Sequence, residues 1–207
     1  MIRITLASSG LLLVLFLIIH LAGLVVAVIA PTKFELYAAA LHSAYWMHLL
    51  ECGLLVVALI HMSLTIKKVM DNFQASNSSS LVSRRKDYLA VLAARSQPLG
   101  GVCLLSFLLI HINQLRFPRP LDGAELSTLH FFLESPITLI IYFLGSIALF
   151  LHLFHGIESS YRSLGLLTSE NALLIRNFGR SLSLFIGLGF VLVTGLLGGI
   201  IFPDWLT

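Results

Sequence analysis

The sequence predicts an all-α integral membrane protein, in which a single domain over residues 1–207 forms a bundle of five transmembrane helices. Hydrophobic residues make up 57% of the chain and charged residues only 11%, against roughly 45–50% and 25% in soluble domains. The apolar residues fall into five runs, each close to the 20 or so residues that cross a bilayer. A surface so poor in charge could not face water, so the composition excludes a self-sufficient soluble enzyme.

Each predicted span has its own justification. The five spans cover residues 6–29, 44–66, 98–115, 136–157 and 181–202. The first run is too long for the apolar part of a signal peptide, so we interpret it as a helix of the mature protein. The third span is the shortest. Pro98 and Pro136 stand where the third and fourth spans begin, a position that tolerates a missing N–H group. Before the fourth span, residues 125–135 are predicted to form a short interfacial helix.

The basic residues predict the orientation of the bundle. If alternate loops share a side, ten of the thirteen Lys and Arg residues lie on the side of the N-terminus, and only Lys33, Arg116 and Arg119 lie opposite. Because basic loops stay in the cytoplasm, we expect a cytoplasmic N-terminus and an external C-terminus. The predicted location is therefore the cytoplasmic (inner) membrane, which the chain crosses several times.

One inner loop is especially basic. It joins the second and third spans and contains a serine-rich tract at residues 75–80. Such a cluster suits anionic lipid headgroups or the acidic face of a soluble partner. We call its members the inner basic cluster: Lys67, Lys68, Arg84, Arg85 and Lys86.

Four of the eight histidines lie well inside four different spans: His20, His61, His111 and His152. An imidazole inside the membrane is costly without a partner, so these positions predict a functional site. At the helical rise, His20 and His111 both lie about 20 Å from the inner ends of their spans, and His61 and His152 both lie about 25 Å from the outer ends. Topology therefore predicts an outer pair, His20 with His111, and an inner pair, His61 with His152.

Two facing imidazoles can supply both axial ligands of a haem iron. Such an iron has no open position, which favours electron transfer over oxygen chemistry. The sequence has no C-x-x-C-H motif, so covalent c-type attachment is excluded. Small residues such as Gly10, Gly53 and Gly145 would let a flat cofactor approach, although glycine is also common in ordinary transmembrane packing.

Other uses of the four histidines remain open. They could simply hydrogen-bond across helices. They could also bind zinc or copper in a transporter, but acidic residues are sparse in the spans and no internal repeat is present.

The strings around the histidines follow a recognisable pattern. The first span carries F-L-I-I-H-L, in which the histidine is His20, and the second carries Glu51 ten residues before His61. The fourth span carries, in order, Ser135-Pro136, Tyr142, Gly145, His152 and Gly156. Together these strings resemble the di-haem cytochrome b membrane anchor of succinate:quinone and fumarate:quinone oxidoreductases, in its single-anchor, five-span form. The resemblance covers essentially the whole chain, although loop lengths and the short N-terminal segment differ.

The resemblance implies an electron-transfer subunit of succinate dehydrogenase, an enzyme of the tricarboxylic acid cycle, or of fumarate reductase. It implies two b haems, a proximal one on His61 and His152 at the inner side and a distal one on His20 and His111 at the outer side. A flavoprotein subunit and an iron–sulfur subunit would dock on the cytoplasmic face, and the membrane substrate would be menaquinone or another quinone. No nucleic-acid partner is implied. The chain would belong to an enzyme complex without forming its catalytic head.

The outer entry of the second span is a candidate quinone site. His42 and His48 lie there, with Glu51 one turn deeper. A quinone exchanges protons on reduction, so its site needs titratable groups near water. The same residues also fit an ordinary interfacial belt, and both interpretations stay open. His130, in the predicted interfacial helix, is interpreted as structural.

Three further residues are candidates for contact with haem propionates. His155 lies three residues after His152 and could compete for ligation or reach a propionate. Arg116 and Arg162 lie just beyond the third and fourth spans, where they could bind propionates or anchor the helices in the interface.

Two other functions remain as alternatives. One is the cytochrome b anchor of a hydrogenase or formate dehydrogenase, which has similar ligands but different partners and usually four spans. The other is a non-haem transporter or assembly protein, in which the histidines only pack.

Overall fold

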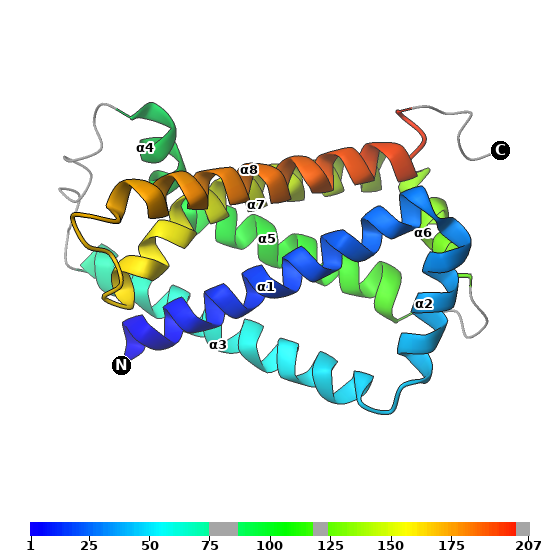
Figure 1. The fold of residues 1–207 in the computed structure, drawn as a ribbon, viewed down its shortest axis with the longest axis horizontal. Coiled ribbons are helices and arrows are strands. Elements are labelled where there is room, and N and C mark those ends of the chain that lie inside the picture. The colour runs from blue at the N-terminus through cyan, green and yellow to red at the C-terminus, as the bar shows by residue number, and fades with distance from the viewer. Residues whose placement is uncertain (75–86, 118–123, 202–207) are drawn as a thin grey trace.

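The computed structural model describes residues 1–74, 87–117 and 124–201, which are helical and contain no strand. Within them, five helices are long and apolar enough to cross a membrane, as predicted. They are α1 (Ile2–Ile29), α3 (Met47–Gln74), α5 (Gln97–His111) with its π-helical extension η2 (Ile112–Arg116), α7 (Pro136–Ser163) and α8 (Ala172–Leu197). The five helices run side by side, and α1 begins and α8 ends at opposite ends of the bundle (Figure 1).

Three short helices lie at the ends of this bundle. The helices α2 (Pro31–Ser43) and α6 (Glu125–Leu133) lie together at one end, and α4 (Tyr88–Arg95) lies at the other (Figure 1). The helix at residues 125–133 confirms the predicted interfacial helix, whereas α2 and α4 were not predicted. We refer to the two ends as the α2–α6 end and the α4 end.

The helix boundaries correct several predicted spans. The helix α3 continues to Gln74 and α7 to Ser163, and α8 begins at Ala172, nine residues before the predicted start. Polar residues end a hydrophobic run, but they need not end a helix, because the backbone hydrogen bonds continue beyond the apolar segment. In α8 the prediction also ran too far: the helix ends at Leu197, and Gly199 follows with φ +69°, a left-handed conformation that glycine adopts without a steric penalty.

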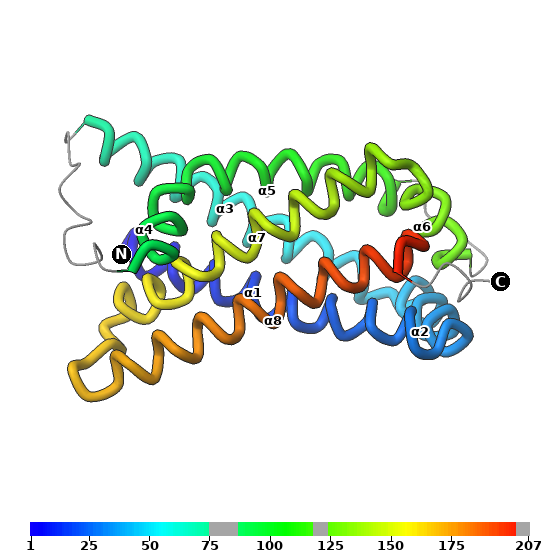
Figure 2. Tube along the Cα trace, turned by 90° about the horizontal axis from the view of Figure 1, so that it is seen from above, coloured from blue at the N-terminus to red at the C-terminus, as the bar shows by residue number. Residues whose placement is uncertain are grey.

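The core of the bundle lies around α7 and α8. These two helices pack along most of their length, α5 lies beside α7, and α1 packs on both α7 and α8 (Figure 2). Glycine makes the close approach possible, because a Cβ atom at Gly187 would lie 2.7 Å from Phe150 and one at Gly189 would lie 2.6 Å from Leu21. Small residues at such contacts are a common device of transmembrane packing.

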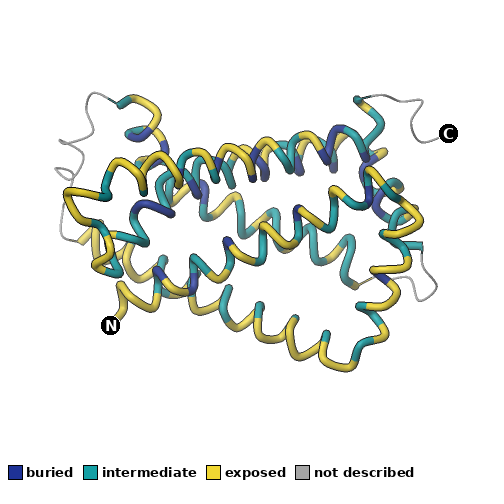
Figure 3. Tube along the Cα trace, in the orientation of Figure 1, coloured by how far each residue is buried: buried dark blue, intermediate teal, exposed yellow. Residues whose placement is uncertain are grey.

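The helix α3 is the outermost of the five. It packs mainly against α1, and none of its residues is buried. Figure 3 shows the contrast, with buried positions gathered along α7 and α8 while α3 is exposed or intermediate throughout. The side of α3 that carries His61 nevertheless lies toward α7, where the candidate site begins.

Candidate functional site

Four helices bring the intramembrane histidines together in two pairs. His20 of α1 lies beside His111 at the end of α5, with ring centroids 5.9 Å apart and ring planes at 83°. His61 of α3 lies beside His152 of α7, with centroids 6.3 Å apart and planes at 72°. These are the two pairs that depth in the membrane predicts. The first lies toward the α2–α6 end and the second toward the α4 end, and we keep the names outer pair and inner pair for them.

The ring separations suit a metal ion between two axial imidazoles. A metal–imidazole bond is about 2 Å long, so two such bonds and the two ring radii together span roughly 6 Å. Both pairs have this separation. Among the described residues no three His, Cys, Asp or Glu side chains gather as a metal site would need. Two ligands are enough for a haem iron, because the porphyrin supplies the other four.

A buried nitrogen of the inner pair supports the same chemistry. His152 Nδ1 is buried, and no hydrogen-bond partner for it exists within the described parts of the chain. Leaving a buried polar atom without a partner costs about 1–3 kcal/mol. A metal ion bound at this nitrogen would supply the missing partner and make the burial of the imidazole favourable, so the inner pair fits the iron of a resident haem if His152 binds it through Nδ1.

Aromatic rings enclose the outer pair. Phe16 stacks on His20 with centroids 5.5 Å apart, and Phe190 lies 6.0 Å from the same ring. Phe107 stacks on His111 at 5.5 Å. Aromatic rings therefore pack on the planes of both imidazoles, a contact that would also hold them as ligands of a haem.

Each pair also contains one histidine that contacts a hydroxyl group. His61 Nδ1 lies 3.2 Å from Ser9 Oγ of α1. His111 Nδ1 lies 3.1 Å from Tyr142 Oη of α7. The Tyr142 hydroxyl continues to Gln114 Oε1 at 3.3 Å, and Gln114 Nε2 donates to Thr138 Oγ1 at 3.3 Å. Sequence reasoning missed Ser9, Gln114 and Thr138, because these contacts join different helices and no local pattern marks them.

The glycines noted in the sequence have different surroundings. A Cβ at Gly10 would lie 3.0 Å from His61 Cε1, so this residue lets α1 approach the inner pair. A Cβ at Gly145 would lie 2.8 Å from Phe107, which makes this glycine a helix-packing contact of α7 with α5. A Cβ at Gly53 would meet nothing within 4 Å.

The three candidate quinone-site residues do not share one environment. Glu51 accepts two hydrogen bonds from Arg116, at 3.0 Å from Nε and 2.7 Å from the terminal nitrogen. His42 lies on α2, and its Nδ1 is 2.7 Å from Glu125 Oε1 of α6. His48 is exposed on the first turn of α3. The structure thus ties His42 to the α2–α6 contact and Glu51 to the end of α5.

The proposed propionate contacts have protein partners of their own. Arg116 pairs with Glu51, and Arg162 donates to Glu158 Oε1 at 2.8 Å. Arg176 of α8 lies 3.4 Å from the other oxygen of Glu158. Glu158 was not predicted, and its carboxylate is 7% exposed between two arginines at the α4 end. His155 is partly buried on α7, one turn from His152.

Other predicted features lie at the surface. Lys67 is 3.7 Å from Asp71 on exposed α3, whereas Arg84, Arg85 and Lys86 of the inner basic cluster, together with Arg119, lie outside the described residues. His130 Nδ1 lies 2.7 Å from the Leu197 carbonyl oxygen and so joins α6 to the end of α8, in agreement with its structural interpretation.

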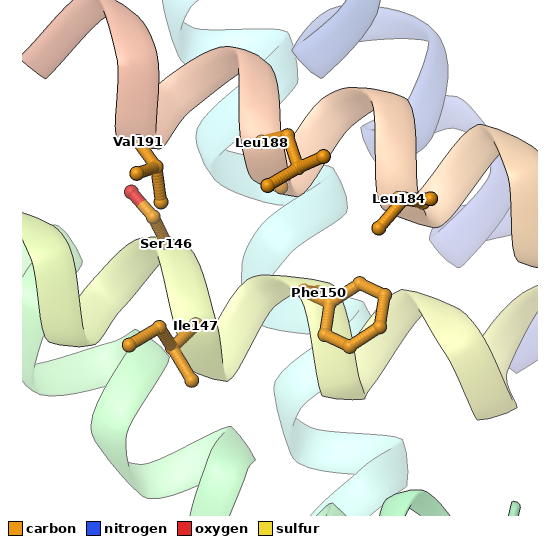
Figure 4. Close-up of a pocket in the computed structure, with 7 residues that line it drawn as sticks. Ser146, Ile147, Phe150, Leu184, Leu188 and Val191 are labelled. Atoms are coloured by element: carbon orange, nitrogen blue, oxygen red, sulfur yellow. The ribbon is translucent and has the colours of Figure 1, made fainter. Parts of the chain in front are cut away.

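A pocket between α7 and α8 is distinct from the histidine pairs. Figure 4 shows Ser146, Ile147 and Phe150 of α7 facing Leu184, Leu188 and Val191 of α8. Its lining is apolar apart from one serine, and it holds no titratable group. The histidine pairs are therefore the chemistry-bearing part of the described structure.

Comparison with known proteins found no matching family, no similar curated protein and no similar solved structure.

Proposed function

We propose that this chain is the di-haem cytochrome b anchor of a succinate:quinone or fumarate:quinone oxidoreductase. The observation that carries the proposal is the pairing of four intramembrane histidines from four helices, at 5.9 Å and 6.3 Å between ring centroids. His61 and His152 would hold one b haem, and His20 and His111 would hold the other. Each bound haem iron would accept and pass on one electron at a time without an open coordination position.

The protein residues give each redox centre its position. The packing of α1, α5, α7 and α8 fixes the outer pair, and α3 brings His61 to α7 for the inner pair. The two pairs lie at different depths of the bundle, so they would connect a donor at one membrane face with an acceptor near the other. The protein's contribution is to fix spacing, orientation and environment, while the cofactors carry out the redox chemistry.

We infer the partners from the charge distribution. The basic residues gather on the side of the N-terminus, and this bias supports a cytoplasmic α4 end in a cell with an inner membrane. A flavoprotein and an iron–sulfur subunit would dock there, close to the inner pair. The quinone would react toward the α2–α6 end, near the outer pair and the Glu51–Arg116 ion pair.

The spectrum of the purified protein tests the proposal. A dithionite-reduced minus oxidised difference spectrum should show a sharp low-spin b-type α-band, and haem extraction should give about two haems per chain. A protein that carries no haem would contradict the proposal and favour a transporter or assembly function. Co-purification of a flavoprotein and an iron–sulfur subunit distinguishes this anchor from that of a hydrogenase or formate dehydrogenase.

A further inference from the structure

In each pair, Nδ1 of one histidine lies beside a hydroxyl group. That hydroxyl also has a second acceptor to which it can donate its proton. This arrangement is the same in both pairs, although the hydroxyl belongs to a serine of α1 in one and to a tyrosine of α7 in the other. A hydroxyl has a single proton and can donate only once, while its oxygen can also accept. Each of these hydroxyls has a second acceptor within reach, and a hydroxyl that donates there has only its oxygen left for the histidine.

In the outer pair the second acceptor of the hydroxyl is Gln114. The amide nitrogen of Gln114 donates to Thr138 Oγ1, which turns the amide oxygen toward Tyr142. Tyr142 Oη donates its proton to that oxygen at 3.3 Å. A phenol that donates to Gln114 can accept from His111, whose Nδ1 is 3.1 Å away. In this arrangement His111 would carry its proton on Nδ1, and its Nε2 would have a free lone pair.

In the inner pair the second acceptor of the hydroxyl is a backbone carbonyl of α1. Ser9 Oγ donates to the Leu6 carbonyl oxygen at 3.0 Å, within its own helix. The same oxygen lies 3.2 Å from His61 Nδ1 and, with its own proton on Leu6, can accept from it. Gly10 permits this contact, because its missing Cβ would lie 3.0 Å from His61 Cε1. Ser9 is itself buried, so water does not compete for the bond.

We propose that Ser9 and Tyr142 are positioning residues for the two metal sites, each of which fixes the Nδ1–H tautomer of one histidine and leaves its Nε2 as the ligand atom. This inference rests on the proposed function for its redox consequence. A histidine that donates its second N–H to an acceptor becomes a more basic ligand. A more basic axial ligand stabilises ferric over ferrous iron, so each hydroxyl lowers the midpoint potential of its own haem.

The redox consequence is tested by a pair of substitutions with opposite targets. Ser9→Ala should raise the midpoint potential of the inner haem and leave the outer one unchanged, and Tyr142→Phe should do the reverse. The potentials are measured by optical redox titration of the intact complex and assigned with His152→Ala and His20→Ala, each of which retains one haem. Ser183→Ala is the control for serine, because Ser183 is buried and donates to the carbonyl three residues earlier in α8, at Arg180. Tyr161→Phe is the control for tyrosine, since Tyr161 lies on the same helix but packs against a separate group of buried residues: Val14, Leu153, Ile157 and Ile186.

The tautomers can be measured independently of the haems. In ¹⁵N-histidine-labelled full-length protein in lipid bilayers, His61 and His111 should show the chemical shifts of the Nδ1–H tautomer, with signals assigned by their loss in the His61→Ala and His111→Ala variants. An Nε2–H tautomer at either residue would overturn the inference for that pair. The measurement is made on haem-free protein, because ligation through Nε2 would by itself leave the proton on Nδ1, so a failure of the proposed function and a failure of this inference are distinguishable.

The remaining outcomes are also decisive. If potentials stay unchanged in both variants, or if both haems shift together in each, the hydroxyls do not act on individual ligands. If Ser9→Ala loses the inner haem altogether, Ser9→Thr, which keeps the hydroxyl, should restore it at close to the original potential. Failure of that rescue would contradict a role for the hydroxyl.

Discussion

At the scale of single residues, the histidine side chains gain their significance from their neighbours. One imidazole buried in a membrane helix is most simply explained by a hydrogen bond to another helix. Here each of the four lies beside a second imidazole, and His152 keeps a buried Nδ1 without a partner in the described chain. Such an arrangement is costly unless a ligand is bound between the rings, which is why we base the function on the pairs and not on any one histidine.

The pairing predicts which haem each histidine holds. We expect His61→Ala and His152→Ala to remove the same haem, halving the haem content and leaving one spectral component in both variants. The physical reason is that a bis-histidine site does not survive the loss of either ligand at this depth. Haem content and redox titration of the purified variants check the prediction.

The matched control for these variants is His130→Ala, which removes a histidine whose Nδ1 lies 2.7 Å from the Leu197 carbonyl oxygen. It should retain both haems. If His61→Ala and His152→Ala removed different haems, the pairing derived from depth and seen in the ring contacts would not be the ligand pairing.

At the scale of elements, the close contacts of α7 and α8 depend on residues without a side chain. A Cβ at Gly187 would lie 2.7 Å from the Cβ of Phe150, an atom next to the backbone that has little freedom to move. The helix α3 is the opposite case, since it has no buried residue and packs mainly on α1. The bundle therefore combines a tightly packed pair of helices with a loosely packed one.

This difference predicts the effect of adding side-chain volume. Gly187→Val should destabilise the bundle by roughly 1–3 kcal/mol, because overpacking forces the two backbones apart. The thermal unfolding temperature in detergent should fall. Gly53→Val is the control, because a Cβ there meets nothing within 4 Å. Equal effects at both positions would contradict a packing role specific to Gly187.

One carboxylate caps the short helix α4 and joins it to α8. Asp87 accepts from the Ala90 backbone N–H at the start of α4 and pairs with Arg180 of α8. The hydrogen bond from the Ala90 N–H and the one from Arg180 together hold the pKa of Asp87 below its usual range. Such a group stabilises the folded state above its unfolded pKa, and this contribution is lost as the pH falls through the lowered folded pKa.

We therefore expect the first turn of α4 to loosen in acid, by a modest amount because the Asp87 side chain is partly exposed. Backbone hydrogen exchange in residues 88–95 should be slow at neutral pH and accelerate once the pH falls below the ordinary range of aspartate. Asp87→Asn should show fast exchange already at neutral pH, with little further change on acidification. Slow exchange of α4 in this variant at neutral pH would show that its apolar contacts suffice, since Ala90 and Ala93 are buried in any case.

At the scale of the whole molecule, the two ends of the bundle differ in chemistry. The α4 end carries arginines around Glu158 and most of the basic residues of the chain. Glutamate side chains make the polar contacts of the α2–α6 end. Glu35 accepts hydrogen bonds from the backbone N–H groups of Glu125 and Leu126 at the start of α6. Glu51 forms an ion pair with Arg116. A relay across the membrane would use the first end for soluble partners and the second for quinone.

The basic end predicts salt-sensitive assembly. Reversing charge with Lys67→Glu and Lys68→Glu should weaken binding of the soluble subunits most at low ionic strength, and the difference from the unsubstituted protein should shrink as ionic strength rises, because exposed charges are screened. Retention of the subunits on immobilised anchor at increasing salt measures the effect. Lys33→Glu, at the α2–α6 end, should leave retention unchanged. Unchanged salt tolerance in the double variant would leave these lysines only their part in orienting the chain.

We expect quinone to react at the α2–α6 end. Glu51→Gln should slow quinone turnover several-fold, while both haem spectra and electron transfer from succinate to soluble artificial acceptors persist. The amide keeps the shape of Glu51 but loses the charge that pairs with Arg116 and could exchange protons. Glu134→Gln, exposed at the same end, is the control. Normal quinone turnover in Glu51→Gln would move the site toward the inner pair and Arg162.

The sequence by itself determined the five spans and the membership of both histidine pairs. A run of about 20 apolar residues has one stable arrangement in a bilayer, and a constant rise per residue then converts sequence position into depth. That is why His20 could be matched with His111, and His61 with His152, before any contact was known. The helix ends were less predictable, because α8 continues through Arg176 and Arg180 beyond its apolar segment.

Only the tertiary structure decided which residues surround each histidine. Ser9 beside His61, Tyr142 beside His111, Arg116 on Glu51 and Glu158 between two arginines all depend on how each helix is rotated about its axis and which helix lies next to it. Depth is a property of one helix in a bilayer, whereas rotation and neighbour order arise from packing among all of them, including glycine contacts such as Gly10 with His61. The sequence pattern therefore carries information about depth but not about helix rotation or neighbour order.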